Sequence, residues 1–212
     1  VAHASTNHEQ ISTLRFACEM LGGAVRAHGK SASLTAPNSP AQQKLLITAM
    51  ASTAVLAEDC VCIEGHGTGT ALGDPIELAA LDAVMLTSST GEKNSMLLGG
   101  GKANYGHSEP AAGAEGLLKL MDSLQRQQSA PNAQLRELNK HATALLAKNS
   151  AALLSTQVVG LRDTHLAMGV SSFGYAGTIA HLILRQPAMC AIGQQARTCH
   201  FRFRSFEWGK AF

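Results

Sequence analysis

Short apolar runs that end in glycine are the clearest pattern in the chain, and they predict buried strands. Val61-Cys62-Ile63 precedes a glycine-rich loop, and Met96-Leu97-Leu98 precedes three consecutive glycines. Residues 166–173 and 178–185 are apolar or alternating and flank a glycine turn, which predicts a hairpin. A further strand is expected near residues 20–25.

Longer stretches between these runs carry helix start signals. The first helix is expected to begin at Ser39-Pro40-Ala41-Gln42, with Ser39 as the cap, and to end near Glu58. The second begins at Asp74-Pro75-Ile76-Glu77, where Asp74 can cap the helix and Glu77 can reach back as in a capping box. This alternation of strand and helix predicts an α/β fold with a mostly parallel sheet.

The pattern becomes weaker after residue 127. A short helix over residues 142–148 and a strand within residues 153–159 are expected there. The last residues, HFRFRSFEWGKAF, are basic and aromatic. A segment that packs back on the domain explains them better than a nucleic-acid site, because a single run of this kind is a weak signal.

Composition places the chain among globular proteins and excludes several classes of function. Its 212 residues are 45% hydrophobic and 15% charged, and the net charge of +2 is too small to suggest nucleic-acid binding. No apolar run is long enough to span a membrane. The start at Val1, without a signal-peptide pattern, leads us to expect a processed or partial chain.

The cysteines indicate a reducing environment rather than a disulfide framework or a metal site. There are five of them, an odd number without metal-type spacing. Cys60 and Cys62 are two residues apart, so we expect them on one face of a strand as buried thiols. We therefore expect an intracellular protein without a bound metal, with no choice between cytoplasm and plastid.

The glycine-rich loop after residue 63 is the first candidate for chemistry. The run EGHGTGTALGDPIE places His66, Thr68 and Thr70 between glycines at the end of a strand, a usual position for sites in α/β proteins. A solvated histidine in a tight turn is the simplest interpretation. Dinucleotide binding is a second, because a G-x-G-x-x-x-G run follows a strand, but the helix signals come after the glycines and no P-loop lysine follows.

A second candidate site follows the strand at residues 96–98. In GGGKANYGHSEPAAGAEGLLKL, Lys102 and His107 lie on a glycine-bounded loop, before a long helix expected to begin at Ser108 or Glu109 and to end near Gln127. Small residues in the first half of that helix allow close approach to the sheet. The positive end of the helix dipole favours a neutral imidazole at His107. The alternative for Lys102 is a surface lysine.

Three motifs, in their order along the chain, carry a family resemblance. EGHGTGTALGDPIE, GKANYGHSEPAAGAEGLLKL and GVSSFGYAGTIAHLIL closely resemble the C-terminal half of the β-ketoacyl synthase domain of type I polyketide synthases. The resemblance covers nearly all of residues 22–184 and implies the second half of a thiolase-like fold, with α/β/α layers and a C-terminal hairpin. It divides the chain into an N-terminal segment (1–21), a ketosynthase C-terminal domain (22–186) and a basic, aromatic tail (187–212).

The resemblance implies decarboxylative Claisen condensation as the chemistry. In this reaction a malonyl group on an acyl carrier protein loses carbon dioxide, and the resulting enolate attacks an acyl thioester. His66 and His107 match the family's two histidines that bind the malonyl thioester and stabilise the enolate. Fixed donors in a dry site stabilise such charge strongly. Lys102 matches the lysine that organises this pocket.

Further residues and the partners are also implied by the resemblance. Thr68 and Thr70 match threonines that hydrogen-bond a phosphopantetheine arm, and Tyr175 matches a gating aromatic whose backbone N–H joins the oxyanion hole. Phe173 belongs to the same substrate-binding set. The expected partners are an acyl carrier protein, which brings the phosphopantetheine, and an N-terminal ketosynthase half or another subunit. No cofactor is expected to be bound by the chain itself.

The chain departs from the family pattern in places that affect its activity. The family nucleophile is a cysteine of the first half, within a motif like Thr-Ala-Cys-Ser-Ser, and none of the five cysteines here lies in such an elbow. Ile179 replaces a usual Asn, and Arg26 and His28 stand where Asn and Asp are usual. Three hypotheses stay open: a ketosynthase part that requires a first half, a non-catalytic structural subunit or relic, and a malonyl decarboxylase.

Overall fold

The centre of the structure is a mixed six-stranded sheet in the order β1-β8-β7-β2-β3-β5. This computed structural model describes residues 18–29, 36–86, 95–149, 152–161 and 167–187. The strands of the sheet are β1 (Glu19–Ala27), β2 (Cys60–Glu64), β3 (Met96–Gly99), β5 (Ala152–Leu153), β7 (Ala167–Phe173) and β8 (Thr178–Arg185). From β7 to β5 neighbouring strands are parallel, whereas β8 is antiparallel to both β7 and β1. The predicted mostly parallel sheet with a hairpin is therefore confirmed.

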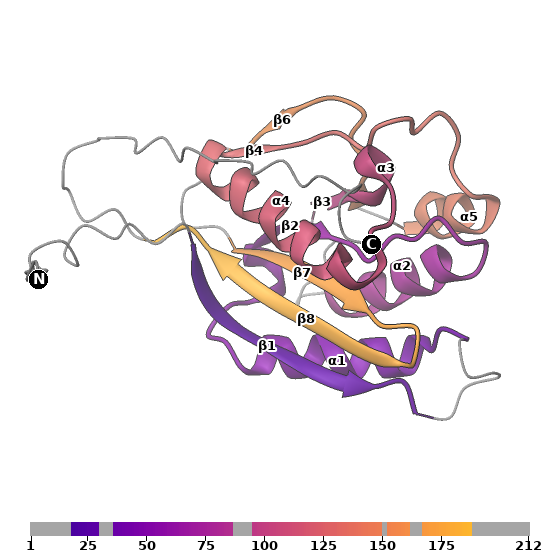
Figure 1. The fold of residues 1–212 in the computed structure, drawn as a ribbon, viewed down its shortest axis with the longest axis horizontal. Helices are drawn as coiled ribbons and strands as arrows, with labels where there is room; N and C mark the ends of the chain where they lie inside the picture. The colour runs from indigo at the N-terminus through magenta and orange to yellow at the C-terminus, as the bar shows by residue number, and fades with distance from the viewer. Residues whose placement is uncertain (1–17, 30–35, 87–94, 150–151, 162–166, 188–212) are drawn as a thin grey trace, which may run out of the picture.

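Helices cover both faces of this sheet (Figure 1). Helices α1 (Ser39–Ala51) and α2 (Gly73–Val84) pack on one face, where Leu46 and Leu81 join Ile63 in a buried cluster. Helix α4 (Ala112–Arg126) packs on the other face, where Leu120 joins Cys62 in a second cluster. The smaller elements are the 3₁₀ helices η2 (Ala57–Asp59) and η3 (Glu109–Ala111), helices α3 (Lys102–Tyr105) and α5 (Lys140–Asn149), and the paired strands β4 (Gln128–Ser129) and β6 (Val159–Gly160).

The prediction that Cys60 and Cys62 share one face of a strand is wrong. The pairing of β2 with β7 shifts its register between these two residues. A bulge adds one residue to a strand and so reverses the side-chain alternation beyond it. Cys60 consequently joins the cluster under α1 and α2, together with Ile63, whereas Cys62 joins the cluster under α4.

The first helix begins and ends at other residues than predicted. Asn38 caps α1 in place of Ser39, because the Asn38 Oδ1 accepts a hydrogen bond from the Ala41 N–H at 3.2 Å. The helix ends at Ala51 rather than near Glu58. The Ser52 hydroxyl donates to the Ala49 carbonyl at 2.7 Å, and such side-chain bonds offer the backbone an alternative to helix continuation.

The predictions after residue 107 are confirmed for the helices and wrong for one strand. Helix α4, preceded by η3, matches the long helix, and α5 matches the short helix expected over residues 142–148. The single strand expected within residues 153–159 is instead two short strands, β5 and β6, in different sheets. A turn separates them, in which the Ser155 hydroxyl accepts from the Gln157 N–H at 3.1 Å. The basic tail lies outside the described residues.

The hairpin of β7 and β8 buries one imidazole completely. His181 is 0% exposed, and its Nδ1 lies 2.9 Å from the Ser171 hydroxyl across the hairpin. Its Nε2 has no hydrogen-bond partner within the described part of the chain. Burial lowers the pKa of His181 from 6.5 to about 4. The folded chain therefore holds this ring in its neutral form.

We expect acid to destabilise the fold through His181. Because its folded pKa lies below its unfolded value of 6.5, its neutral form contributes stability above pH 6.5, and this is lost as pH falls toward 4. The loss amounts to about 3 kcal/mol for this shift. Urea unfolding at pH 7 and pH 4 should show a smaller acid loss in His181→Asn than in the wild type. The exposed His141, changed to Asn, is the control and should lose as much as the wild type; equal losses in all three proteins would contradict the expectation.

A side chain at Gly169 should destabilise the same hairpin. A Cβ at this buried position would lie 2.5 Å from the Ile63 Cδ1 and 2.7 Å from the His181 Nε2. We expect Gly169→Ala to lower the free energy of unfolding by about 1–3 kcal/mol, as overpacking of a core typically does. Gly160→Ala is the matched control, because a Cβ there meets nothing within 4 Å. Chemical denaturation compares the two variants, and an equal effect of both would contradict the packing analysis.

Candidate functional site

Two glycine-rich loops meet at the carboxyl ends of β2 and β3. These strands are parallel neighbours, with Glu64 opposite Gly99, so the loops that follow them lie at the same edge of the sheet. The Gly65 N–H donates to the Gly99 carbonyl at 2.8 Å and joins the two loops directly. The first loop carries His66, and the second leads into α3, which begins with Lys102.

His66, His107 and Lys102 converge as the sequence predicts. The ring centroids of His66 and His107 are 5.9 Å apart, with their planes at 86°. The Lys102 Nζ donates a hydrogen bond to the His66 carbonyl oxygen. Phe173 lies at the end of β7, and its ring centroid is 5.1 Å from the ring centroid of His66. Three segments that are distant in sequence therefore meet around one imidazole.

Both imidazoles accept a backbone hydrogen bond at Nδ1. The Phe173 N–H donates to the Nδ1 of His66 at 3.3 Å, and the Glu109 N–H donates to the Nδ1 of His107 at 3.0 Å. A neutral ring that accepts at Nδ1 carries its hydrogen on Nε2. Each histidine is thus set up to donate one hydrogen bond from Nε2.

The charges around His66 favour its neutral form. Burial, and then the electrostatic interactions with Lys102 and His107, lower the pKa of His66 from 6.5 to about 4. Burial also lowers the pKa of the Lys102 ammonium, while the nearby carboxylates, first of them Glu77 and Glu64, raise it. At neutral pH His66 is therefore a hydrogen-bond donor without a charge of its own.

The three residues differ in their exposure to solvent. His66 and Lys102 are half-buried, but His107 is exposed. His107 lies in the short link between α3 and η3, and no described segment covers its side chain.

Asp74 and Glu77 hold the His66 loop instead of capping α2, so the predicted capping box is wrong. The two oxygens of Glu77 accept hydrogen bonds from the backbone N–H groups of His66, at 2.7 Å, and Gly67, at 3.0 Å. The Asp74 Oδ1 accepts from the Gly69 N–H at 3.1 Å. Gly69 has a φ of +74°, which lets the loop turn back over the helix start. Both carboxylates thus accept hydrogen bonds from backbone N–H groups of the loop that have no partner in the sheet.

Two further buried polar residues hold the Lys102 loop, and sequence analysis missed both. Glu64 is 4% exposed; it pairs with Lys119 of α4 at 2.6 Å and accepts from the Gly101 N–H. The Asn132 side chain accepts from the Gly100 N–H at 2.7 Å and donates to the Leu98 carbonyl at 2.9 Å. A charged residue at the end of an apolar strand was the available signal for Glu64.

The remaining predicted site residues are more peripheral. Thr68 is half-buried, and Thr70 is exposed, with its hydroxyl accepting from the Gly73 N–H at 3.0 Å. Tyr175 lies in the turn between β7 and β8 and is 84% exposed. Of the predicted substrate-binding set, Phe173 contacts His66 and Thr68 lines a neighbouring cavity, whereas Thr70 and Tyr175 are exposed.

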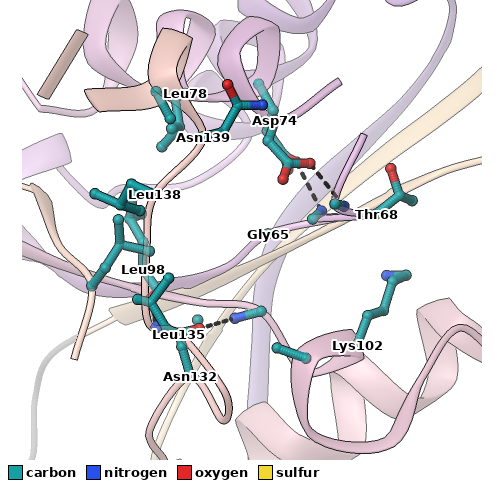
Figure 2. A pocket seen from close by; sticks show the side chains of 18 of the residues that line it. Gly65, Thr68, Asp74, Leu78, Leu98, Lys102, Asn132, Leu135, Leu138 and Asn139 are labelled. Carbon is teal, nitrogen blue, oxygen red and sulfur yellow. Dashed lines mark hydrogen bonds between the residues drawn. The ribbon is translucent and has the colours of Figure 1, made fainter. Parts of the chain in front are cut away.

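A cavity of about 510 Å³ adjoins the His66 loop. Figure 2 shows Thr68 and Lys102 on one side of it and Leu78, Leu98, Leu135 and Leu138 on the other. Neither His66 nor His107 lines this cavity. It therefore lies beside the loop rather than between the imidazoles.

The described thiols are poorly suited to act as nucleophiles. Burial raises the pKa of Cys60 to about 12 and that of Cys62 to about 11, and it also raises the pKa of Cys18. All three stay protonated at neutral pH, and the thiolate is the reactive form. Within the described residues there is also no cluster of histidine, cysteine or carboxylate side chains fit to hold a metal, and no helix of the length and apolarity that a membrane crossing needs.

Known proteins share both the sequence and the fold of this chain. Residues 17–136 match the family "Beta-ketoacyl synthase, C-terminal domain". Over 170 residues, 78% of the chain, it is 39% identical to a phenolphthiocerol/phthiocerol polyketide synthase of Mycobacterium tuberculosis, and over 176 residues, 82% of the chain, it is 34% identical to a PKS-NRPS hybrid synthetase of Aspergillus candidus. The chain spans 7% of the length of each of these relatives.

Solved structures of ketosynthases give the same result. An oxazolomycin ketosynthase domain of Streptomyces albus superposes with a TM-score of 0.73 at 28% identity, over 89% of this chain and 50% of that one. The ketosynthase from module 6 of the bacillaene synthase of Bacillus subtilis gives 0.76 at 27% identity, over 86% of this chain and 33% of that one. The fold is thus thiolase-like, as predicted, and the chain belongs to the β-ketoacyl synthase family, where it corresponds to the C-terminal domain of polyketide synthase ketosynthases.

Proposed function

We propose that this chain supplies the malonyl-activating half of a decarboxylative Claisen condensation. The observation that carries the proposal is the imidazole pair: two rings 5.9 Å apart, each accepting a backbone N–H at Nδ1 and therefore each donating from Nε2. Two fixed hydrogen-bond donors suit an oxygen that gains negative charge during a reaction. A malonyl thioester has such an oxygen.

The proposed reaction begins with the donor thioester. The bond between the malonyl carboxylate and the α-carbon breaks, carbon dioxide leaves, and the electron pair forms an enolate whose oxygen accepts hydrogen bonds from His66 and His107. The enolate carbon then attacks the carbonyl of an acyl thioester, and the thiolate that held the acyl group leaves. The product is a β-ketoacyl thioester on the carrier protein.

Lys102 has a supporting role in this proposal. Its ammonium donates to the His66 carbonyl and lowers the pKa of the His66 ring. It thereby keeps His66 neutral, so that an imidazolium does not form at the acidic end of the working pH range. Thr68, Thr70, Phe173 and Tyr175 are proposed to line the path of the carrier protein's phosphopantetheine arm.

The full condensation needs a partner in this proposal. The acyl chain requires a nucleophilic thiol, and the described cysteines are protonated at neutral pH. We propose that an N-terminal ketosynthase half supplies this thiol and covers the exposed His107, and that an acyl carrier protein delivers the malonyl group. The proposal also keeps residues 22–186 as the ketosynthase C-terminal domain.

Malonyl decarboxylation without condensation is the second candidate. It needs the two donors and no reactive thiol. The described residues contain both imidazoles, and their thiols are protonated at neutral pH. A purely structural subunit is less favoured, because both imidazoles keep their backbone hydrogen bonds. Ile179, which replaces a usual Asn, is fully buried in β8, so the strand accommodates it.

Removal of either imidazole should strongly slow decarboxylation of the malonyl group. In the chain combined with an N-terminal ketosynthase half, we expect His66→Ala or His107→Ala to slow carbon dioxide release from malonyl carrier protein about 10²–10³-fold, the usual effect of losing one donor to a developing oxyanion. Release of labelled carbon dioxide measures the rate. His141→Ala, an exposed histidine of α5, should leave it unchanged. Undiminished release from both site variants would refute the proposal, and release by the chain alone would favour the second candidate.

Removal of the Lys102 charge should raise the pKa of His66. Lys102 is the second cause of the lowered value, after burial, so Lys102→Met should move the pKa upward from about 4 while keeping it below 6.5. NMR titration of the His66 ring measures this. The exposed Lys140→Met on α5 is the control and should have no effect. A His66 pKa that does not move in Lys102→Met would show that the ammonium is not coupled to the ring.

A further inference from the structure

Asn132 is a buried asparagine in the loop 130–139, which connects β4 to α5, and it is 7% exposed. Its Oδ1 accepts from the Gly100 N–H at 2.7 Å, and its Nδ2 donates to the Leu98 carbonyl at 2.9 Å. The backbone N–H of Asn132 donates to the Ser155 carbonyl at 2.8 Å. This residue therefore joins the end of β3, the loop that leads to Lys102 and the turn after β5 (Figure 2).

Asn104 of α3 makes the reciprocal connection. Its Nδ2 donates to the Pro131 carbonyl at 3.2 Å, and its Oδ1 accepts from the Ala133 N–H at 2.9 Å. These two backbone groups belong to the residues directly before and after Asn132. Asn104 and Asn132, called the asparagine pair below, thus connect α3 and the loop 130–139 from both sides.

Helix α3 has little stability of its own. It has four residues, three consecutive glycines precede it, and Gly106, with a φ of +86°, follows it. Isolated helices of this length are not stable in water, and glycine leaves the adjoining backbone flexible. The orientation of α3 therefore depends on side chains that bind it to neighbouring segments, and the asparagine pair supplies such bonds.

The orientation of α3 decides where its first residue, Lys102, points. The Lys102 ammonium donates to the carbonyl oxygen of His66 on the neighbouring loop. Its electrostatic interaction with His66 is the second cause, after burial, of the lowered pKa of that ring. Such an interaction weakens as the charge moves away. A rotation of α3 that withdraws the ammonium would therefore change the ring as well.

An asparagine suits position 132 because the site needs a donor and an acceptor together. The Gly100 N–H requires an acceptor and the Leu98 carbonyl requires a donor, and a primary amide supplies both. An aspartate there would turn an acceptor toward the Leu98 carbonyl. An alanine would leave both buried backbone groups without this partner, which is costly.

We propose that Asn104 and Asn132 are positioning residues for Lys102: by joining α3 to the loop 130–139, they hold the ammonium at the His66 carbonyl. They act through Lys102 and contact no reacting group. The kinetic part of this inference rests on the proposed function. The coupling between Lys102 and His66 can be measured in the chain without any reaction.

Asn104→Ala and Asn132→Ala are the test variants. Asn104 is exposed, so its replacement should leave the fold intact and decides the question if Asn132→Ala does not fold. Asn38→Ala is the matched control, because Asn38 caps α1 and belongs to neither glycine loop. It should lower the melting temperature, as the loss of a helix cap does, without affecting Lys102.

The first measurement is an NMR titration of the His66 ring in the full chain. Both test variants should raise the pKa of His66 from about 4, by less than Lys102→Met does, because the ammonium is displaced and not removed. Asn104→Ala should cause no further rise when Lys102→Met is already present, since residues that act through one another are not additive. Asn38→Ala should leave the pKa unchanged.

The second measurement is malonyl decarboxylation by the chain joined to an N-terminal ketosynthase half. In both test variants we expect kcat to fall about 10-fold with KM little changed, because a supporting group is misplaced and binding is retained. Asn38→Ala should keep the kcat of the wild type.

Four results would overturn the inference. An unchanged His66 pKa in the test variants would show that the asparagine pair does not position Lys102. A full rise in Asn104→Ala on top of Lys102→Met would show that the effect does not pass through Lys102. An equal rise in Asn38→Ala would assign it to a general loss of stability. A raised pKa with an unchanged kcat would show that the position of Lys102 has no catalytic use.

Failure of this inference can be distinguished from failure of the proposed function. If the wild type joined to its N-terminal half releases no carbon dioxide, the proposed function fails. The titration of His66 still decides whether the asparagine pair positions Lys102.

Discussion

The site depends on buried polar side chains that satisfy the backbone of two glycine loops. A loop at the end of a strand leaves amides without a ladder partner, and burial makes each unpaired amide costly. Glu77 and Asp74 supply acceptors for the first loop, and Glu64 and Asn132 supply them for the second. These bonds let flexible glycine segments hold a defined shape close to other backbone. These hydrogen bonds fix the loops that carry the imidazoles.

The sequence was sufficient for most of the elements and for bringing the candidate site residues together. Apolar runs ending in glycine located β2, β3 and the hairpin, and the ends of parallel strands brought His66 and Lys102 together. The sequence was insufficient where a hydrogen-bond acceptor can bind either the backbone of its own helix or a loop that is distant in sequence. The sequence around Glu77 is compatible with a capping box. Only the tertiary structure shows that its oxygens accept hydrogen bonds from the His66 loop instead. The bulge in β2 likewise depends on its pairing with β7.

The residues of the candidate site differ in their exposure. His66 and Lys102 rest on this chain's own loops and are half-buried, whereas His107 faces outward. The solved ketosynthases extend well beyond the part that this chain matches. The described loops thus hold both imidazoles by backbone hydrogen bonds and leave His107 exposed.

The outer strand β1 has a consequence for how the protein is made. It pairs along its length with β8, and Arg185 of β8 bonds Glu19 of β1 at 2.9 Å across 166 positions of sequence. A ribosome adding about 5–20 residues per second needs on the order of ten seconds or more to synthesise that interval. During this time β1 lacks the strand that it pairs with, and Phe173, which contacts the His66 ring, has not yet been added. Synthesis of the β7–β8 hairpin therefore completes the pairing of β1 and the contact with His66 at the same stage.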